Sequence, residues 1–160
     1  MKLAIIYFSK SGNTKKMAEY IAEGMKTVSN IEVGVFDLDN IEESFLKESK
    51  AVVFGTPTYY ANTCWQLKKW LDESGKYNLE GKLGAVFATA NYLQGGADTA
   101  ILTIINHLMV KGMLVYSGGT ALGQPFIHLG AIALKDNLEE SRGLFQIYGE
   151  RIAKKAVELF

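Results

Sequence analysis

Short apolar segments recur along the chain and are separated by longer, amphipathic ones. Four of the short segments, at residues 2–8, 31–37, 51–55 and 83–89, are almost continuously apolar and rich in β-branched side chains, and residues 113–117 form a weaker fifth. Near-continuous apolar runs of this length are typical of strands that are buried on both faces of a parallel sheet. The pattern therefore predicts five such strands.

The segments between these runs show helical spacing. Met17, Ile21, Met25 and Val28 lie four and three residues apart, which predicts a helix that packs one face on the sheet. Further helices are expected around residues 65–71, at residues 101–110 and at residues 138–159. Regular alternation of strands and helices predicts right-handed crossovers and a doubly wound α/β fold, with residues 1–160 as one domain.

One segment departs from this alternation. Residues 118–137 include Gly118, Gly119, Gly123 and Gly130, and they are too long and too glycine-rich for a simple connection between a strand and a helix. Long loops at the carboxyl ends of strands in α/β proteins commonly serve the binding site. His128 lies in this loop and is the candidate catalytic or substrate-contacting side chain.

Composition and charge exclude several classes of protein. Seventeen basic and seventeen acidic side chains cancel, so the bulk charge does not favour binding to nucleic acid or to an anionic membrane. No apolar stretch is long enough for a membrane span, and the run after Met1 is too short for a signal peptide. Cys64 is the only cysteine, which rules out an internal disulfide and suits a reducing compartment. A cytoplasmic protein is expected.

A polar, hydroxyl-rich loop joins the first predicted strand to the first predicted helix. Its residues are Ser9, Lys10, Ser11, Gly12, Asn13 and Thr14. The N–H groups at a helix start are unpaired and carry the positive end of the helix dipole, so a phosphate group binds there readily. The same residues also fit ordinary helix capping. The loop lacks both the Gly-Lys-Ser/Thr ending of a Walker A loop and a Gly-x-Gly-x-x-Gly fingerprint, which favours a monophosphate.

Four segments together resemble one protein family. Residues 9–14 resemble the Ser/Thr-x-Ser/Thr-Gly-Asn-Thr phosphate loop of flavodoxins, and residues 55–62 are similar to the Gly-Thr-Pro-Thr-aromatic-Gly-Asn stretch of the WrbA-like NAD(P)H:quinone oxidoreductases. Residues 88–96 follow the fourth predicted strand as that family's second flavin loop does, and residues 107–113 resemble the end of its fourth helix. The resemblance spans essentially the whole chain and implies a flavodoxin-like fold with strand order 2-1-3-4-5.

The resemblance also implies that FMN is the cofactor and that three loops hold it. Tyr59 or Tyr60, together with Tyr92, suit stacking on the flavin ring, although exposed loop aromatics would show the same pattern. No metal site is expected. The cofactor-binding residues expected from the three loops are Ser9, Ser11, Gly12, Asn13, Thr14, Pro57, Thr58, Tyr59, Tyr60, Ala61, Asn62, Thr89, Ala90, Asn91, Tyr92, Gln94, Gly95 and Gly96.

Other residues near these loops are interpreted as structural. Asn62 is expected to cap the following helix rather than to touch FMN directly. Trp65 and Trp70 are expected to be packing residues of that helix, and Cys64 is expected to be a buried, unreactive thiol. His107 falls on an apolar helical stripe and suits a partly buried position.

Three observations favour an enzyme over an electron carrier. The chain lacks the acidic surplus of carrier flavodoxins, residues 89–96 contain no acid to disfavour an anionic hydroquinone, and Ala61 stands where the family usually has Gly. A Cβ resists positive φ by about 1 kcal/mol or more, so the peptide flip thought to accompany semiquinone formation in flavodoxins should be impaired. We therefore expect little neutral semiquinone and two-electron chemistry.

The expected reaction transfers two electrons from NAD(P)H to a quinone or similar small-molecule acceptor. The alternative is a flavodoxin-type one-electron carrier protein, and a flavin-free binding domain is a third hypothesis. Val110 and Lys111 stand where WrbA-like enzymes have a His pair, so any role of that pair is either lost here or taken up by Lys111 or His128. A homodimer or homotetramer is expected only from the resemblance.

Overall fold

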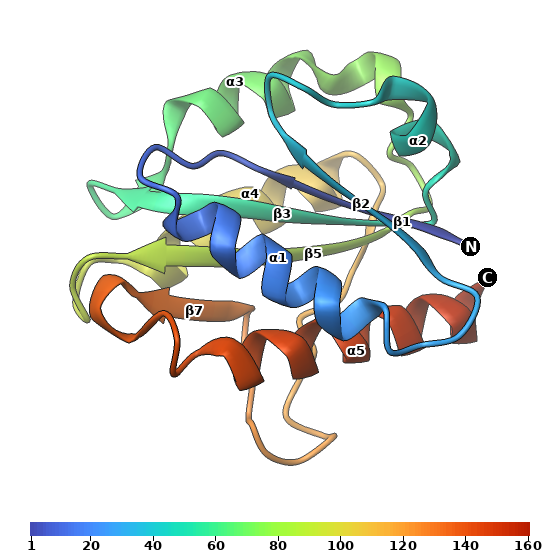
Figure 1. Cartoon of the computed structure of the whole chain (residues 1–160). Helices are drawn as coiled ribbons and strands as arrows, with labels where there is room; N and C mark the ends of the chain where they lie inside the picture. The colour runs from blue at the N-terminus through green and yellow to red at the C-terminus, as the bar shows by residue number, and fades with distance from the viewer.

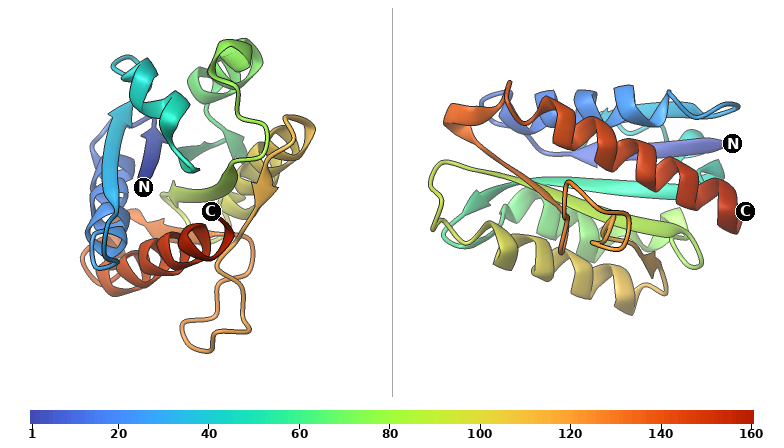
Figure 2. Two further views of the ribbon diagram at one scale, coloured as in Figure 1. Left: turned by 90° about the vertical axis from the view of Figure 1, so that its right-hand side faces the viewer. Right: turned by 90° about the horizontal axis from the view of Figure 1, so that it is seen from below.

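The computed structural model describes residues 1–160 and has three layers (Figure 1). A mostly parallel sheet lies in the middle, and α1 (Asn13–Met25) and α5 (Arg142–Leu159) cover one of its faces. The other face carries α2 (Glu43–Glu48), α3 (Trp65–Glu73) and α4 (Ala97–Val110), as Figure 2 shows. None of the helices has the combined length and apolar character needed to span a bilayer.

The sheet confirms the predicted topology. Its main strands are β1 (Lys2–Tyr7), β2 (Glu32–Asp37), β3 (Ala51–Tyr59), β5 (Leu83–Ala90) and β6 (Leu114–Val115), all parallel and in the order β2-β1-β3-β5-β6. Two short strands extend the sheet beyond the prediction. One is β4 (Asn62–Thr63), which pairs with β3 in the antiparallel direction, and the other is β7 (Ala131–Leu134), which pairs with β5 in the parallel direction. Counted along the chain, the main strands have the expected order 2-1-3-4-5.

Burial on both faces explains why the strands are continuously apolar. Leu3 and Ile5 of β1 pack in a core cluster with α1 and α5, whereas Ala4 and Ile6 point into a second cluster on the opposite face. All four side chains are fully buried. Because successive side chains of a strand point to opposite faces, a strand between two helical layers needs an apolar residue at every position.

Two glycines allow α1 and α5 to cross at very short distance. A Cβ placed on Gly24 of α1 would overlap the carbonyl oxygen of Gln146, and a Cβ on Gly149 of α5 would overlap that of Ile21. The obstruction in both cases is backbone, which cannot rotate away as a side chain can. The two helices therefore form one close-packed layer whose spacing depends on these residues.

The fifth strand is interrupted, which corrects the prediction of one strand at residues 113–117 followed by a loop through residue 137. Pairing with β5 begins at Leu114 and Val115, breaks off, and resumes at Ala131. The segment 118–137 thus contains β7 and a short 3-10 helix, Lys135–Asn137, and α5 begins at Arg142 rather than at residue 138. The run of β7 is only four residues long and follows a glycine-rich stretch, so its sequence signal is weak.

The loop between the two halves of the fifth strand, residues 116–130, is held by a buried arginine. Arg151 of α5 is 8% exposed, and its guanidinium donates hydrogen bonds to five backbone carbonyl groups of the loop rather than to a carboxylate. The shortest of these bonds, to the carbonyl oxygen of Pro125, is 2.9 Å long. Arg151 therefore fixes a loop that contains no helix or strand and projects from the edge of the sheet (Figure 1).

Candidate functional site

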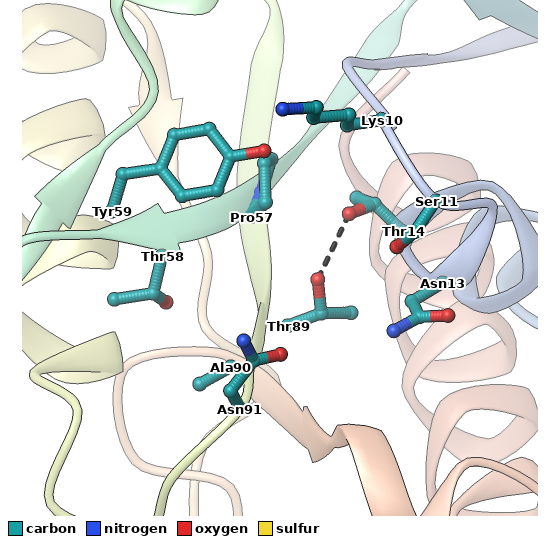
Figure 3. A pocket seen from close by; sticks show the side chains of 10 residues that line it. All are labelled: Lys10, Ser11, Asn13, Thr14, Pro57, Thr58, Tyr59, Thr89, Ala90 and Asn91. Atoms are coloured by element: carbon teal, nitrogen blue, oxygen red, sulfur yellow. Dashed lines mark hydrogen bonds between the residues drawn. The ribbon is translucent and has the colours of Figure 1, made fainter.

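A cavity of about 440 Å³ opens at the carboxyl ends of β1, β3 and β5. Figure 3 shows that its side chains come from three segments: the turn after β1 with the start of α1, the end of β3, and the end of β5 with the turn after it. We call residues 9–14, 57–62 and 89–96 the first, second and third loops, with the strand and helix ends that they include. Its lining residues are Lys10, Ser11, Asn13, Thr14, Pro57, Thr58, Tyr59, Thr89, Ala90 and Asn91. Parallel strands end at one edge of the sheet, so segments far apart in sequence meet there, as the sequence predicts for a binding site.

The first loop presents unpaired backbone donors to this cavity. Gly12 precedes α1 with a φ of 90°, a left-handed conformation that glycine adopts without strain. No side chain caps α1, so the N–H groups of its first turn have no acceptor within the helix. Because these N–H groups also carry the positive end of the helix dipole, they suit an anionic group such as a phosphate. The alternative of ordinary side-chain capping is wrong for this helix.

Hydroxyl groups near the cavity are arranged in two ways. The hydroxyls of Thr14 and Thr89 are both buried and lie 2.8 Å apart in a hydrogen bond that joins the first loop to the third (Figure 3). The Oγ atom of Ser9 and the Oγ1 atom of Thr58 are also buried, yet neither has a hydrogen-bond partner. A buried hydroxyl without a partner costs about 1–3 kcal/mol, so both groups favour a bound ligand that accepts hydrogen bonds.

The second loop is a tight hairpin, and it corrects the expectation for Ala61. Tyr59 of β3 pairs with Asn62 of β4, which leaves Tyr60 and Ala61 as a two-residue turn. Their φ values are 50° and 57°, as a type I′ turn requires at both central positions. Ala61 therefore already has positive φ, so its Cβ does not keep the turn out of the left-handed region.

The third loop contacts the second directly. Gly96, with a φ of 83°, precedes α4, and a Cβ placed on it would overlap the Cβ of Ala61. Tyr92 is 71% exposed, and Tyr60 is fully exposed at the tip of the hairpin. Gln94 and Gly96 line a neighbouring cavity of about 640 Å³ that also includes Ile132 and Leu134 of β7. The two loops thus form a joined wall beside the 440 Å³ cavity.

The structure brings only part of the predicted set into the cavity. Ser11, Asn13, Thr14, Pro57, Thr58, Tyr59, Thr89, Ala90 and Asn91 line it, whereas Ser9, Gly12, Tyr60, Ala61, Asn62, Tyr92, Gln94, Gly95 and Gly96 lie in the same loops without lining it. Lys10 lines the cavity and was missed, although it lies inside the predicted phosphate loop. His128 is exposed in the loop before β7 and does not line the cavity.

Three structural interpretations near the site have different outcomes. Asn62 does not cap α3; its side-chain oxygen accepts a hydrogen bond of 2.8 Å from the N–H of Thr63. Trp70 packs between Phe54 and Tyr77 as expected, but Trp65 is 68% exposed, so the prediction that it packs is wrong. A residue at the start of a helix can point past the sheet edge, where no second layer covers it.

Cys64 is a buried thiol, as expected. It is fully buried, and burial raises the pKa of its thiol, which keeps the group protonated and unreactive. The Oγ1 of Thr56 accepts a hydrogen bond from the backbone N–H of Cys64 at 3.2 Å and lies 2.9 Å from the Oγ1 of Thr63. These bonds tie the base of the hairpin to β3.

The electrostatics of the cavity favour an anionic ligand. Lys10 is the only charged lining residue, and no carboxylate lines the cavity. Burial raises the pKa of Tyr59, so its phenol stays protonated and available as a hydrogen-bond donor. No cluster of three or more His, Cys, Asp or Glu residues is placed to hold a metal ion.

Comparison with known proteins places this geometry in a family. The model of the flavodoxin family matches residues 5–119. A flavodoxin of Clostridium saccharobutylicum is 54% identical over 160 residues, which cover 100% of both chains. An NAD(P)H dehydrogenase (quinone) of Aromatoleum aromaticum is 32% identical over 143 residues, covering 72% of this chain and 69% of that protein. The crystal structure of a flavodoxin, WrbA-like protein from Agrobacterium tumefaciens shares the fold, with 24% identity, a TM-score of 0.81 and 99% of each chain covered.

These relatives correct the prediction of an NAD(P)H-dependent quinone reductase. The relative with 54% identity over its whole length is named a flavodoxin, an electron carrier, whereas the quinone dehydrogenase is less similar and is matched over only part of its chain. The enzyme prediction is therefore wrong. It relied on the neutral overall charge, on the absence of acids in residues 89–96 and on Ala61, and the hairpin geometry removes the last of these three reasons.

Proposed function

We propose that this chain, which belongs to the flavodoxin family, carries FMN and transfers single electrons between redox partner proteins. The observation that carries the proposal is the cavity at the carboxyl ends of β1, β3 and β5, whose first loop combines an uncapped helix start with the unpartnered hydroxyl of Ser9.

The cavity residues fit the two chemically different parts of FMN. The first loop, with Ser9, Ser11 and Asn13 beside the free N–H groups of α1, suits the phosphate. The second and third loops supply Tyr59 as an aromatic wall and Asn91 as a polar group for the flavin ring. When FMN is bound it supplies the electron-accepting ring, and the protein's part is to position that ring and tune its environment.

The protein's contribution to redox tuning is electrostatic. No carboxylate lines the cavity, and residues 89–96 contain no acid, so the reduced, anionic flavin meets little repulsion from nearby negative charge. We expect the potential for adding the second electron to be less negative than in a carrier with acids at these positions. The lack of nearby acids therefore affects the redox potential of the flavin and does not decide between a carrier and an enzyme.

Anaerobic titration of the FMN-loaded protein with dithionite tests the proposed function. A one-electron carrier should pass through half-reduced flavin, visible as a long-wavelength absorbance band that rises and then falls. Direct conversion from oxidised to fully reduced flavin, without that band, would contradict the proposal. A preparation that purifies colourless and gains no bound flavin from added FMN would support the flavin-free alternative.

Riboflavin provides the control for the phosphate loop. Riboflavin lacks only the phosphate of FMN, so its affinity for the apoprotein should be weaker by at least about tenfold if the first loop binds phosphate through charge-assisted hydrogen bonds. Equal affinity for FMN and riboflavin would show that the first loop does not contribute. Quenching of flavin fluorescence measures both constants.

A further inference from the structure

A separate cavity of about 250 Å³ lies between α3 and the turns that follow β1 and β2. Figures 1 and 2 show α3 and the turn after β2 on the same side of the sheet. Both tryptophans of the chain line this cavity, which we call the tryptophan cavity. Its lining residues are Phe8, Leu38, Asp39, Trp65, Gln66, Lys69, Trp70 and Glu73.

The two indole rings of the tryptophan cavity differ in their surroundings. Trp70 is fixed from behind, because its ring is stacked on Tyr77 with 5.2 Å between centroids and lies 5.8 Å from Phe54. Trp65 packs against no other aromatic ring and is 68% exposed. A large exposed aromatic side chain beside a cavity is characteristic of recognition sites, because its flat face gains most from a partner that stacks on it.

Polar groups of the tryptophan cavity lack partners within the chain. The Oε1 atom of Gln66 and the Nε1 atom of Trp70 are buried and form no hydrogen bond. Asp39 and Glu73 form no ion pair, whereas Glu43 of α2, on the same face of the sheet, pairs with Lys47 and Lys76. Lys69 is also unpaired, so the two carboxylates and this lysine leave one net negative charge at the cavity.

These features match one chemical group better than others. A guanidinium group is planar and cationic, it stacks on an indole face, and it carries five N–H donors in a fixed geometry. The tryptophan cavity offers the exposed face of Trp65, two free carboxylates and the unpaired Gln66 oxygen, and its volume suits a single side chain. An ammonium group satisfies the charge but not the stacking.

We propose that the tryptophan cavity receives an arginine side chain of the protein that exchanges electrons with this chain, an inference that depends on the proposed carrier function. The position supports this, because Phe8 of the tryptophan cavity directly precedes Ser9 of the phosphate loop, and Trp65 begins the helix that follows the hairpin. A partner held by this arginine lies next to the cofactor edge. The contact is local, so it does not require an acidic surplus over the whole surface.

The test uses FMN-loaded, ¹⁵N-labelled protein and measures the NMR signals of the two indole N–H groups. N-acetyl-arginine amide is the probe, with N-acetyl-lysine amide and the uncharged N-acetyl-citrulline amide as comparisons. Saturable shifts of both indole signals are expected for the arginine probe, with affinity at least about fivefold higher than for either comparison. No saturable shift, or equal affinity for citrulline or lysine, would overturn the proposal.

Variants locate the binding groups. The pair Asp39→Asn/Glu73→Gln should weaken binding of the arginine probe by about fivefold or more, because both charged acceptors are lost. The matched control pair is Asp136→Asn/Glu140→Gln. It removes two exposed carboxylates that lie outside the tryptophan cavity and form no ion pair, so it should leave binding of the arginine probe unchanged. Equal effects of the two pairs would show that only net charge matters and would refute the site. A dithionite titration of the same sample reports the carrier function separately, so failure of one proposal is distinguishable from failure of the other.

Discussion

The hydroxyl of Tyr148 takes the place of a missing strand residue beside Val86. It donates a hydrogen bond of 2.9 Å to the Val86 carbonyl oxygen and accepts one of 3.3 Å from the Val86 N–H. Val86 lies where β5 has no neighbour on that side, since β6 pairs up to Gly84 and β7 begins at Phe87. One side chain of α5 therefore satisfies the backbone that the interrupted fifth strand leaves unpaired.

Replacing Tyr148 by Phe should destabilise the protein by about 1–3 kcal/mol, because the buried N–H and carbonyl group of Val86 lose their partner. The measurement is the midpoint of urea unfolding. Tyr116→Phe is the control, because it removes a tyrosine hydroxyl that forms no hydrogen bond within the chain and should change the midpoint little. Equal effects of the two substitutions would show that the pairing with Val86 does not stabilise the sheet.

Gly149→Ala should destabilise the protein by about 1–3 kcal/mol, because the new Cβ meets the backbone carbonyl of Ile21 and forces α1 and α5 apart. Gly143→Ala is the matched control in the same helix. A Cβ at Gly143 has no neighbour within 4 Å, and alanine has the higher helix propensity, so stability should be unchanged or higher by up to about 1 kcal/mol. Thermal unfolding of both variants compares them directly, and a stable Gly149→Ala variant would contradict the close crossing.

The parts of the fold that were predictable are those with a strong local signal. Continuous apolar runs identify β1, β3 and β5, and the hydroxyl-rich loop at residues 9–14 identifies the start of α1. The strand β7 was not predictable, because its pairing depends on contacts with β5 that lie more than forty positions away. Ala61 was misjudged because a two-residue hairpin imposes positive φ against the residue's own preference. The enzyme was wrongly preferred to the carrier, since both can use the same loops on the same fold and the sequence of these loops does not distinguish them.

The contact between Gly96 and Ala61 should control flavin binding. Gly96→Ala places a Cβ against Ala61 and strains a residue with a φ of 83°, so it should push the second and third loops apart and weaken FMN binding by at least about tenfold. Adding Ala61→Gly removes the Cβ of residue 61 but leaves its Cα 2.6 Å from the new Cβ, so only a small part of the affinity should return. Flavin fluorescence quenching measures both variants. If the two substitutions act additively, the loops are not coupled through this contact.

Stability should fall in acid because several exposed carboxylates are paired only in the folded chain. Hydrogen bonds from Lys16 and Tyr20 lower the pKa of Glu139, and those from Gln146 and Arg142 lower the pKa of Glu23. A carboxyl group whose pKa is lower in the folded than in the unfolded state stabilises the fold above the unfolded pKa, and this stabilisation is lost as the pH falls through the folded pKa. The urea midpoint should thus be nearly constant from about pH 7 to pH 5 and should decrease below about pH 4.5.

Glu139→Gln and Glu23→Gln test this origin of the acid sensitivity. Each should lower stability slightly at neutral pH and make the decrease in acid shallower, because the lost carboxylate no longer takes up a proton on unfolding. Glu140→Gln is the control, since Glu140 is exposed and forms no ion pair, and its profile should match that of the unchanged protein. These ion pairs link α1 to α5 and to the segment before it, so added salt should reduce the difference between variants. A profile of the same slope in all variants would place the acid sensitivity elsewhere in the chain.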